Sequence, residues 1–310
     1  MRYFIFFILI GINVQAQRYN SPKTYLEFVD KNHEQVIEQT WNYMYRYSQE
    51  PNLQKRNGQR KVLENVLKRA IRNIEKERPF DTYFQQAAVK YLNGNLAIVK
   101  EDYVQLLKLD SSKEPLVDKS TIFRKIRNAM YQLRKDYDRA VVNYGLRHNL
   151  IISENDNELA QKMAATIKIY DYYNEMNMLV LQIKNAEAYL WQDISQLTPQ
   201  QFNNRLIELK NTIEVNNNKA IELSESIDIA SLQSVYNDFT KLYSHTFFEK
   251  TSAITVYLTA AANNDRTDIL QKTDAFNQSK TWFNINRKKA YTIWSYGTSQ
   301  YLKILLSELE

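Results

Sequence analysis

WNYMYRYSQEP, residues 41–51, places an aromatic side chain at every second position, namely Trp41, Tyr43, Tyr45 and Tyr47. Alternation by two is typical of a β-strand. The upstream residues follow a helical period instead, because at about 100° per residue one arc of the surface collects mostly apolar side chains. That arc contains Leu26, Val29, His33, Val36, Ile37, Thr40, Trp41, Met44 and Tyr47. The stretch is therefore predicted to end a helix, with Trp41 and Tyr47 in the core and Tyr43 and Tyr45 at its rim.

The same helical period continues along the chain, whose 310 residues include only five Gly and five Pro. So few turn-forming residues argue against a β protein. Thr198 and Gln201 flank Pro199 as a capping box, which marks the start of a helix. The expected fold class is all-α, a bundle of long helices. The helices are predicted near 22–49, 52–78, 81–109, 116–147, 156–194, 199–224, 229–262 and 266–307.

Several short segments of the first half resemble segments of the second half, as in an internal repeat. YSQEPN (47–52) resembles ISQLTP (194–199), IEKERPFD (74–81) resembles IELSESID (221–228), and NYG (143–145) resembles SYG (295–297). Two readings stay open: a duplicated four-helix unit, or a chance alignment of helical segments of similar composition. We expect a first unit at 17–150 and a second at 151–310, joined by the helix near 156–194, which is apolar on two sides.

The first residues, MRYFIFFILIGINVQAQ, have the pattern of a secretory signal. Arg2 precedes a short apolar segment, and the small residues Val14 and Ala16 define a cleavage site after residue 16. An uncleaved membrane-bound tail is the alternative. The chain has no Cys, which excludes a lipid-modified cysteine anchor, disulfides and cysteine-ligated zinc. We expect export to the periplasm or outer surface, and no transmembrane segment in the mature chain.

Charge is distributed unevenly along the sequence. Residues 17–150 contain 25 Lys and Arg against 16 Asp and Glu, whereas residues 151–310 contain 15 against 19. If the second and fourth helices are adjacent, their cations form one basic field that attracts lipopolysaccharide, nucleic acid or an acidic protein. A solvated surface, or pairing with the acidic half in a homo-oligomer, is the alternative. The candidate polyanion-binding residues are Lys55, Arg56, Arg60, Lys61, Lys68, Arg69, Arg72, Arg124, Arg127 and Arg134.

Searches for catalytic and metal-binding patterns give no site. His33 begins HEQVI, but a metalloprotease helix needs a second His where Ile37 stands, so we expect a buried, hydrogen-bonded histidine. His148 is expected at a helix end and His245 is isolated. SENDNE (153–158) lacks the glycine of a calcium loop and is better explained as a helix cap, with Asn155 and Glu158 as the start signal. The carboxylate pair Glu101-Asp102 is expected on an ordinary helix face, so no catalytic residue and no cofactor is predicted.

Several short clusters resemble a family of exported helical bacterial proteins, the leptospiral-type surface proteins. They are Tyr25-Leu26, Trp41-Asn42-Tyr43, Glu158-Leu159, Tyr172-Tyr173-Asn174 and Glu187-Ala188-Tyr189-Leu190, and their order along the chain also fits. The resemblance implies an all-α protein of the surface or periplasm whose function is not established. It implies no catalytic or binding residues.

Three functions remain consistent with the sequence. The first is a non-enzymatic exported protein that acts as an interaction or structural component, with an envelope protein or anionic polymer as partner. The second is a polyanion binder that uses the basic first half, for which nucleic acid ranks below lipopolysaccharide because the protein is expected outside the cytoplasm. The third is a hydrolase based on carboxylates, which would need a cleft holding two convergent carboxylates of raised pKa.

Overall fold

The computed structural model describes residues 19–111, 119–152, 157–227, 230–263 and 266–310, so the predicted signal at 1–16 lies outside the described residues. Helices account for nearly all of these ranges, which contain no strand, and the predicted all-α bundle is confirmed. The first half contains α1 (Pro22–Gln49), α2 (Leu53–Lys76), α3 (Thr82–Lys100), α4 (Asp102–Asp110) and α5 (Ser120–Arg147). The second contains α6 (Glu158–Trp191), η1 (Ile194–Gln196), α7 (Pro199–Glu225), α8 (Gln233–Thr240), η2 (Lys241–Tyr243), α9 (His245–Ala262) and α10 (Arg266–Ser307).

Two of the expected helices are broken. The helix predicted at 81–109 is α3 and α4, separated at Glu101, and the helix predicted at 229–262 is α8 and α9, separated by η2. The helix predicted at 116–147 is described from Ser120. The predicted start at Pro199 is confirmed, because Thr198 and Gln201 form the reciprocal capping box of α7. Helix α6 begins two residues later than Asn155 implied, because the side chain of Asn157 accepts the hydrogen bond from the Ala160 N–H at 2.9 Å. Asn155 itself lies outside the described residues.

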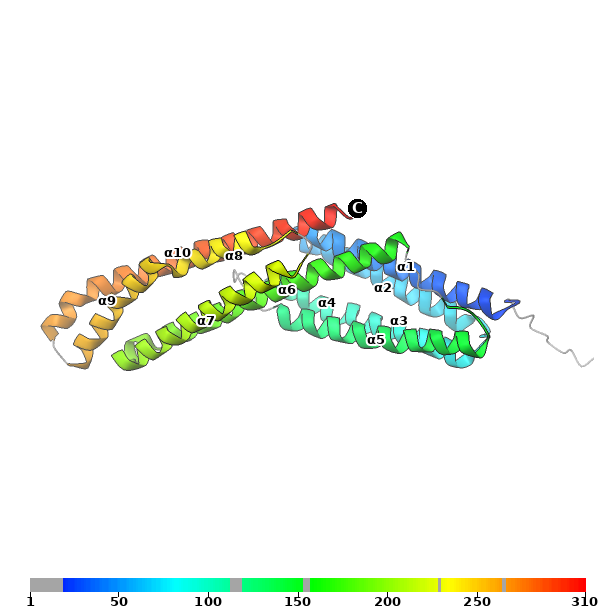
Figure 1. Ribbon diagram of the computed structural model, residues 1–310, viewed down its shortest axis with the longest axis horizontal. Coiled ribbons are helices and arrows are strands. Elements are labelled where there is room, and N and C mark those ends of the chain that lie inside the picture. Colours follow the sequence, from blue (N-terminus) through cyan, green and yellow to red (C-terminus); the bar gives the residue numbers. More distant parts are fainter. Residues whose placement is uncertain (1–18, 112–118, 153–156, 228–229, 264–265) are drawn as a thin grey trace, which may run out of the picture.

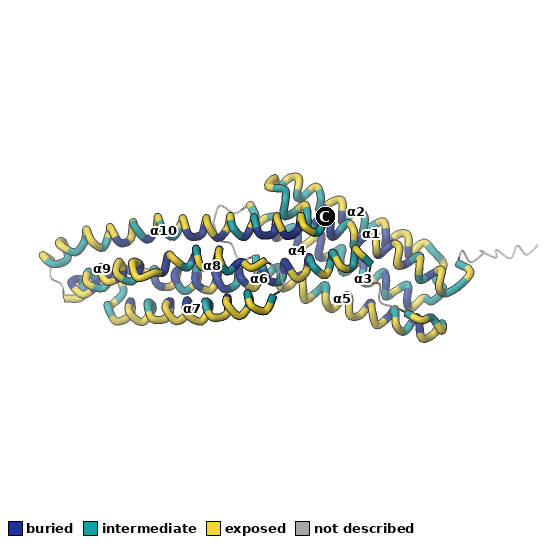
Figure 2. Tube along the Cα trace, turned by 45° about the horizontal axis from the view of Figure 1, so that its top comes forward, coloured by how far each residue is buried: buried dark blue, intermediate teal, exposed yellow. Residues whose placement is uncertain are grey.

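The buried apolar residues form two separate cores, one in each half of an elongated molecule (Figures 1 and 2). The first core is built from α1 to α5 and the second from α6 to α10. The predicted boundary at 150 falls in the connection between α5 and α6. Helix α6 packs on α7 and α10 and also contacts α1 and α5. This double contact explains why its apolar residues do not lie along a single face.

The stretch 41–51 lies where the two halves meet. Met44 packs against both cores, and its carbonyl accepts a hydrogen bond from the Tyr170 hydroxyl of α6 at 3.1 Å. The side-chain amide of Gln49 donates to the carbonyl of Lys303 in α10 at 2.9 Å. Tyr45 donates its hydroxyl proton to the Glu310 carboxylate. The end of α1 therefore connects the first half to both α6 and α10.

The predicted positions of the aromatic side chains need one correction. Trp41 is buried as expected and Tyr45 is half-buried, but Tyr43, expected at the rim, is only 4% exposed. Tyr103 of α4 stacks on Tyr43 with 5.0 Å between ring centroids. The break after α3 lets α4 cover that flank of α1, which a helical period cannot show. Tyr47, expected in the core, is half-buried.

The glycines of the two similar segments NYG (143–145) and SYG (295–297) occupy tightly packed positions. A Cβ added at Gly145 in α5 would lie 2.5 Å from the Ile152 side chain, and one at Gly297 in α10 would lie 2.4 Å from Val235. Because glycine has no side chain, Ile152 can pack closely on α5 at Gly145, and Val235 can pack closely on α10 at Gly297. Their neighbours differ, because Tyr144 is buried and Tyr296 is exposed. A duplication therefore stays a prediction.

Met44→Ala is expected to lower the free energy of unfolding by about 1–2 kcal/mol, below the range of about 2–5 kcal/mol for a fully buried Met because the side chain is only half-buried. Because Met44 couples the two cores, the urea transition should also broaden. Met130→Ala is the matched control, since Met130 packs against the first core alone. Equal broadening in both variants would contradict the coupling.

Candidate functional site

Most of the predicted polyanion-binding residues are engaged in ion pairs. Arg60 is buried, and its guanidinium lies 3.0 Å from Glu64 and 3.2 Å from the Val99 carbonyl. The Lys68 ammonium lies 2.6 Å from the other carboxylate oxygen of Glu64, and this bond is the main reason that the pKa of Glu64 is lowered. Arg60 therefore fastens α2 to α3 and is not available to a ligand.

The N-terminal end of α2 is held by a second set of charges. Arg56 lies over the Tyr47 ring and 2.9 Å from Asp110, whose buried carboxylate also contacts Lys119 and accepts from the Tyr47 hydroxyl. Lys55 is 3.4 Å from Glu50. Because buried charges must be paired, Arg56 and Asp110 serve the packing of α4 under α1 and α2.

The cations of α2 and α5 do not form one field. Helix α3 packs against both α2 and α5 and separates them, so the adjacency that a joint basic surface required is not met in the described structure. On α5, Arg127 pairs with Asp171 of α6 at 3.0 Å and Arg134 pairs with Asp138 at 2.7 Å. Arg124 is exposed and has no charged partner within the described ranges. A hydrophobic pattern gives the helices but not which helices are neighbours, which explains the error.

Three of the predicted cations do meet in one groove between α2 and α3, here called the α2/α3 groove. Its volume is about 510 Å³, and its lining contains the side chains of Lys68, Arg69 and Arg72 but no carboxylate. Arg72 donates through Nε to the Lys68 carbonyl at 3.3 Å, which leaves both terminal amino groups of its guanidinium for a ligand. Arg69 is exposed and has no partner in the described part of the chain. The remaining lining residues are Asn65, Ile71, Asn93 and Leu96.

Helix α3 supplies part of this basic face, and the sequence reading missed it. On α2, Lys61, Lys68, Arg69, Arg72 and Lys76 fall within an arc of about 100°. On α3, a corresponding arc of about 80° contains the polar residues Thr82, Gln86, Lys90, Asn93 and Lys100. The sequence places Lys90 and Lys100 on one side of α3, but these lysines could be assigned to the basic face only once α2 and α3 were known to be neighbours.

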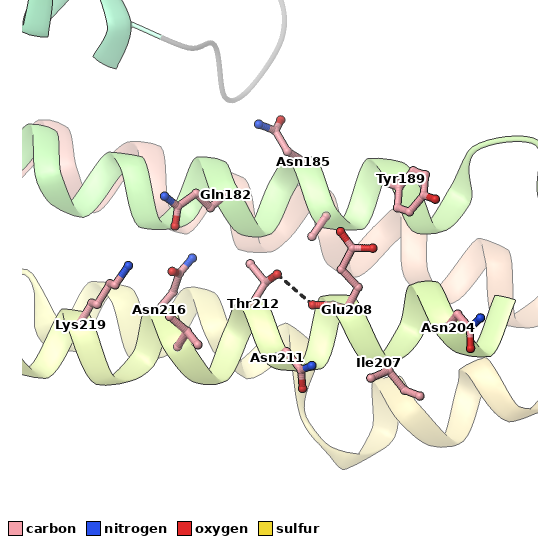
Figure 3. Close-up of a pocket in the computed structure, with 12 residues that line it drawn as sticks. Gln182, Asn185, Tyr189, Asn204, Ile207, Glu208, Asn211, Thr212, Asn216 and Lys219 are labelled. Carbon is pink, nitrogen blue, oxygen red and sulfur yellow. Dashed lines mark hydrogen bonds between the residues drawn. The ribbon is translucent and has the colours of Figure 1, made fainter. Parts of the chain in front are cut away.

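A second groove, between α6 and α7, is lined largely by amides (Figure 3). Its volume is about 740 Å³. The buried Asn216 amide donates to the Leu179 carbonyl at 2.9 Å, and the Thr212 hydroxyl donates to the Glu208 carbonyl at 2.9 Å. The Arg205 guanidinium lies over the Tyr189 ring, 4.3 Å from its centroid. Asn216 and Thr212 are therefore already engaged within the helices that form the groove.

The three histidines lie apart. His33 is buried as expected, but its Nε2 has no hydrogen-bond partner among the described residues, which corrects the expected hydrogen bond. His148 caps α5 and lies 3.5 Å from Asp81, and exposed His245 lies 3.1 Å from Glu249. Within the described ranges, no group of three or more His, Asp or Glu side chains is placed to hold a metal ion.

Two carboxylates, those of Asp102 and Glu187, are buried, which the sequence did not predict. Asp102, expected on an ordinary helix face, is buried and 2.7 Å from Lys125, so that prediction is wrong. Glu187 of α6 is also buried, accepts from the hydroxyls of Tyr243 at 2.7 Å and Tyr291 at 3.0 Å, and lies 3.4 Å from Arg287. Burial raises the pKa of Glu187 despite these bonds. The network links α6, η2 and α10 inside the second core, where a substrate has no access.

Comparison of the chain with protein-family models, curated proteins and solved structures gave no match. The resemblance to the leptospiral-type surface proteins therefore stays a prediction. No helix in the described part of the chain combines the length and the apolar character that crossing a membrane requires.

Proposed function

We propose that the protein is an exported, non-enzymatic interaction protein that binds a phosphate-bearing anionic polymer of the cell envelope, such as lipopolysaccharide, through the α2/α3 groove. One observation carries the proposal: Lys68, Arg69 and Arg72 line a common groove from which carboxylates are absent. Lys68 also pairs with Glu64 at 2.6 Å, so Arg69 and Arg72 are the cations of the groove that have no ion pair among the described residues.

The chemistry of the groove favours phosphate groups. The free edge of the Arg72 guanidinium and the unpaired Arg69 offer planar pairs of N–H donors, which match phosphate oxygens bidentately. Asn65 and Asn93 add neutral amide donors beside them. The basic arcs of α2 and α3 extend beyond the groove in both directions, which suits a polymer or a lipid surface more than a single small anion. Nucleic acid ranks lower because the sequence predicts export.

The carboxylate-hydrolase hypothesis receives less support. It requires two convergent carboxylates of raised pKa in a cleft. A groove between α1 and α5 contains one carboxyl with a raised pKa, Asp30, while Asp138 on the opposite wall is paired with Arg134 at 2.7 Å. We therefore retain the interaction protein as the proposal.

A charge-matched comparison tests the α2/α3 groove. Arg69→Ala with Arg72→Ala is expected to weaken binding of lipopolysaccharide or heparin to the full chain about tenfold at low salt. The slope of log affinity against log salt should fall by about 2, because two contacts to anionic groups of the polymer are lost. Titration calorimetry at several salt concentrations measures both quantities.

Lys135→Ala with Arg139→Ala provides the control, because both residues are exposed on α5 and the change in net charge is the same. The control should leave affinity within about twofold. Equal losses in the two double variants would mean that net charge alone drives association and would refute the groove as the site.

A further inference from the structure

The groove between α1 and α5 is here called the α1/α5 groove. Its volume is about 890 Å³, in the range of sites that enclose small molecules. Helices α1 and α5 form its long walls, Tyr91 of α3 contributes to its lining, and residues 150–152 and the first turn of α6 border it. It shares no lining residue with the α2/α3 groove.

Two buried polar groups that line this groove lack hydrogen-bond partners in the described part of the chain. They are Nε2 of His33 and the hydroxyl of Tyr137, and both side chains are 6% exposed. The two rings lie 4.4 Å apart between centroids. An unsatisfied buried donor or acceptor costs about 1–3 kcal/mol. Two such groups side by side on a cavity wall indicate a place where a ligand supplies the missing bonds.

Large aliphatic side chains project at the open side of the same groove. Leu146 is 74% exposed, Ile151 is 98% exposed and Val142 is also exposed. Leu26, Ile37 and Val141 continue the apolar wall inward. Single exposed aliphatic residues are ordinary, but a group that lines one cavity favours an apolar ligand segment.

The charged side chains that line the α1/α5 groove determine whether it attracts a cationic or an anionic ligand. Asp30, Glu34 and Asp138 line it, against the single guanidinium of Arg134. His33 adds no positive charge at neutral pH, because burial, followed by the nearby Arg134, lowers its pKa to about 3. Desolvation, followed by the charge of Glu34, raises the pKa of Asp30 to about 6 although the side chain reaches solvent. The lining thus carries excess negative charge, which attracts a cation and repels an anion.

We propose that the α1/α5 groove binds a cationic amphiphile, with its aliphatic part against Val142, Leu146 and Ile151 and its ammonium head near Asp30, His33 and Tyr137. The ammonium N–H groups donate to the Asp30 carboxylate and to the Tyr137 oxygen. The Tyr91 and Tyr137 rings, stacked with 5.0 Å between centroids, provide aromatic surface that also favours a cation.

Three probes of equal chain length test this assignment on the full chain: decylamine, 1-decanol and decanoate, all below their aggregation concentrations. Titration calorimetry at pH 7 is expected to show saturable binding of decylamine at least tenfold tighter than that of decanoate, with 1-decanol between them. The imidazole NMR signals of His33 should shift when decylamine binds. Decanoate or 1-decanol binding as tightly as decylamine, or no saturable binding of decylamine, would overturn the proposal.

Matched variants locate the two ends of the ligand. Asp30→Asn should weaken decylamine about tenfold and leave 1-decanol unchanged, whereas Glu38→Gln, the same charge change on exposed α1 surface outside the groove, should leave both unchanged. Leu146→Ser should weaken both ligands, and Leu270→Ser, an equally exposed leucine on α10, should weaken neither. Equal effects of a variant and its control would overturn the assignment of that end. All four side chains are exposed, so these changes leave the folded state intact.

Discussion

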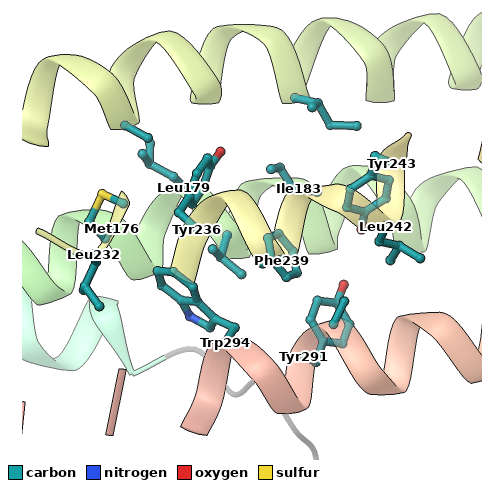
Figure 4. Close-up of a cluster of buried hydrophobic side chains, with 14 of the residues drawn as sticks. Met176, Leu179, Ile183, Leu232, Tyr236, Phe239, Leu242, Tyr243, Tyr291 and Trp294 are labelled. Atoms are coloured by element: carbon teal, nitrogen blue, oxygen red, sulfur yellow. The ribbon is translucent and has the colours of Figure 1, made fainter. Parts of the chain in front are cut away.

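Trp294→Ala is expected to lower the free energy of unfolding by about 4 kcal/mol, the largest effect that we predict for a single side chain. Trp294 is fully buried in the second core, where it packs against Tyr236 and Phe239 of α8 (Figure 4). Its indole N–H donates to the side-chain oxygen of Asn177 at 2.9 Å. Truncation leaves a cavity and also an acceptor without its donor, so both costs add.

Urea denaturation followed by far-ultraviolet circular dichroism measures this effect. Tyr296→Ala is the control, because Tyr296 lies two residues further along α10 and is 67% exposed. The control should change stability by less than about 0.5 kcal/mol. A Trp294→Ala variant that unfolds at the wild-type midpoint would show that α8 and α10 do not pack as described.

Acid is expected to destabilise the protein through His33 by about 3 kcal/mol between pH 7 and pH 4. The unfolded chain binds a proton at His33 near pH 6.5, whereas burial and the nearby Arg134 lower the pKa in the folded state to about 3. A lowered folded-state pKa means that the unfolded state binds more protons in this window. Stability is therefore fully present above pH 6.5 and falls as the pH drops toward 3.

His33→Leu should remove this part of the pH dependence, and His245→Leu should retain it because His245 is exposed. Urea midpoints at pH 7 and pH 4 provide the comparison. Asp30 has a raised pKa and so contributes with the opposite sign, but it is present in wild type and both variants and cancels in the differences. A wild-type loss of stability that persists in His33→Leu would assign the acid sensitivity to other groups.

Helix type and most helix boundaries could be predicted from the sequence because they depend on local features. Pro199 with the Thr198–Gln201 box starts α7 where expected, and the apolar arc of α1 predicts Val29 and Val36 in the core. Tyr43 was misplaced because α4 covers it after a break that leaves no proline or glycine as a signal. A contact between segments distant in sequence has no local signature.

The candidate sites show the same division. The sequence identified Lys68, Arg69 and Arg72 as cations on one face but grouped them with Arg124, Arg127 and Arg134, from which α3 separates them. Their actual neighbours, Asn93 and the basic arc of α3, depend on how the helices pair. The α1/α5 groove joins residues from α1, α3, α5 and the start of α6, so no spacing along the chain could indicate it.

By itself the sequence determined that the chain is all-α, without cysteine chemistry, and unequal in charge between its halves, because period, composition and capping act within a few residues. Tertiary structure alone decided that WNYMYRYSQEP joins two cores and that Arg60 and Asp110 are buried in ion pairs. It also decided that Nε2 of His33 and the Tyr137 hydroxyl line a groove without hydrogen-bond partners among the described residues. The physical reason is that burial and pairing are properties of neighbours in space, and helix packing brings together side chains more than a hundred residues apart.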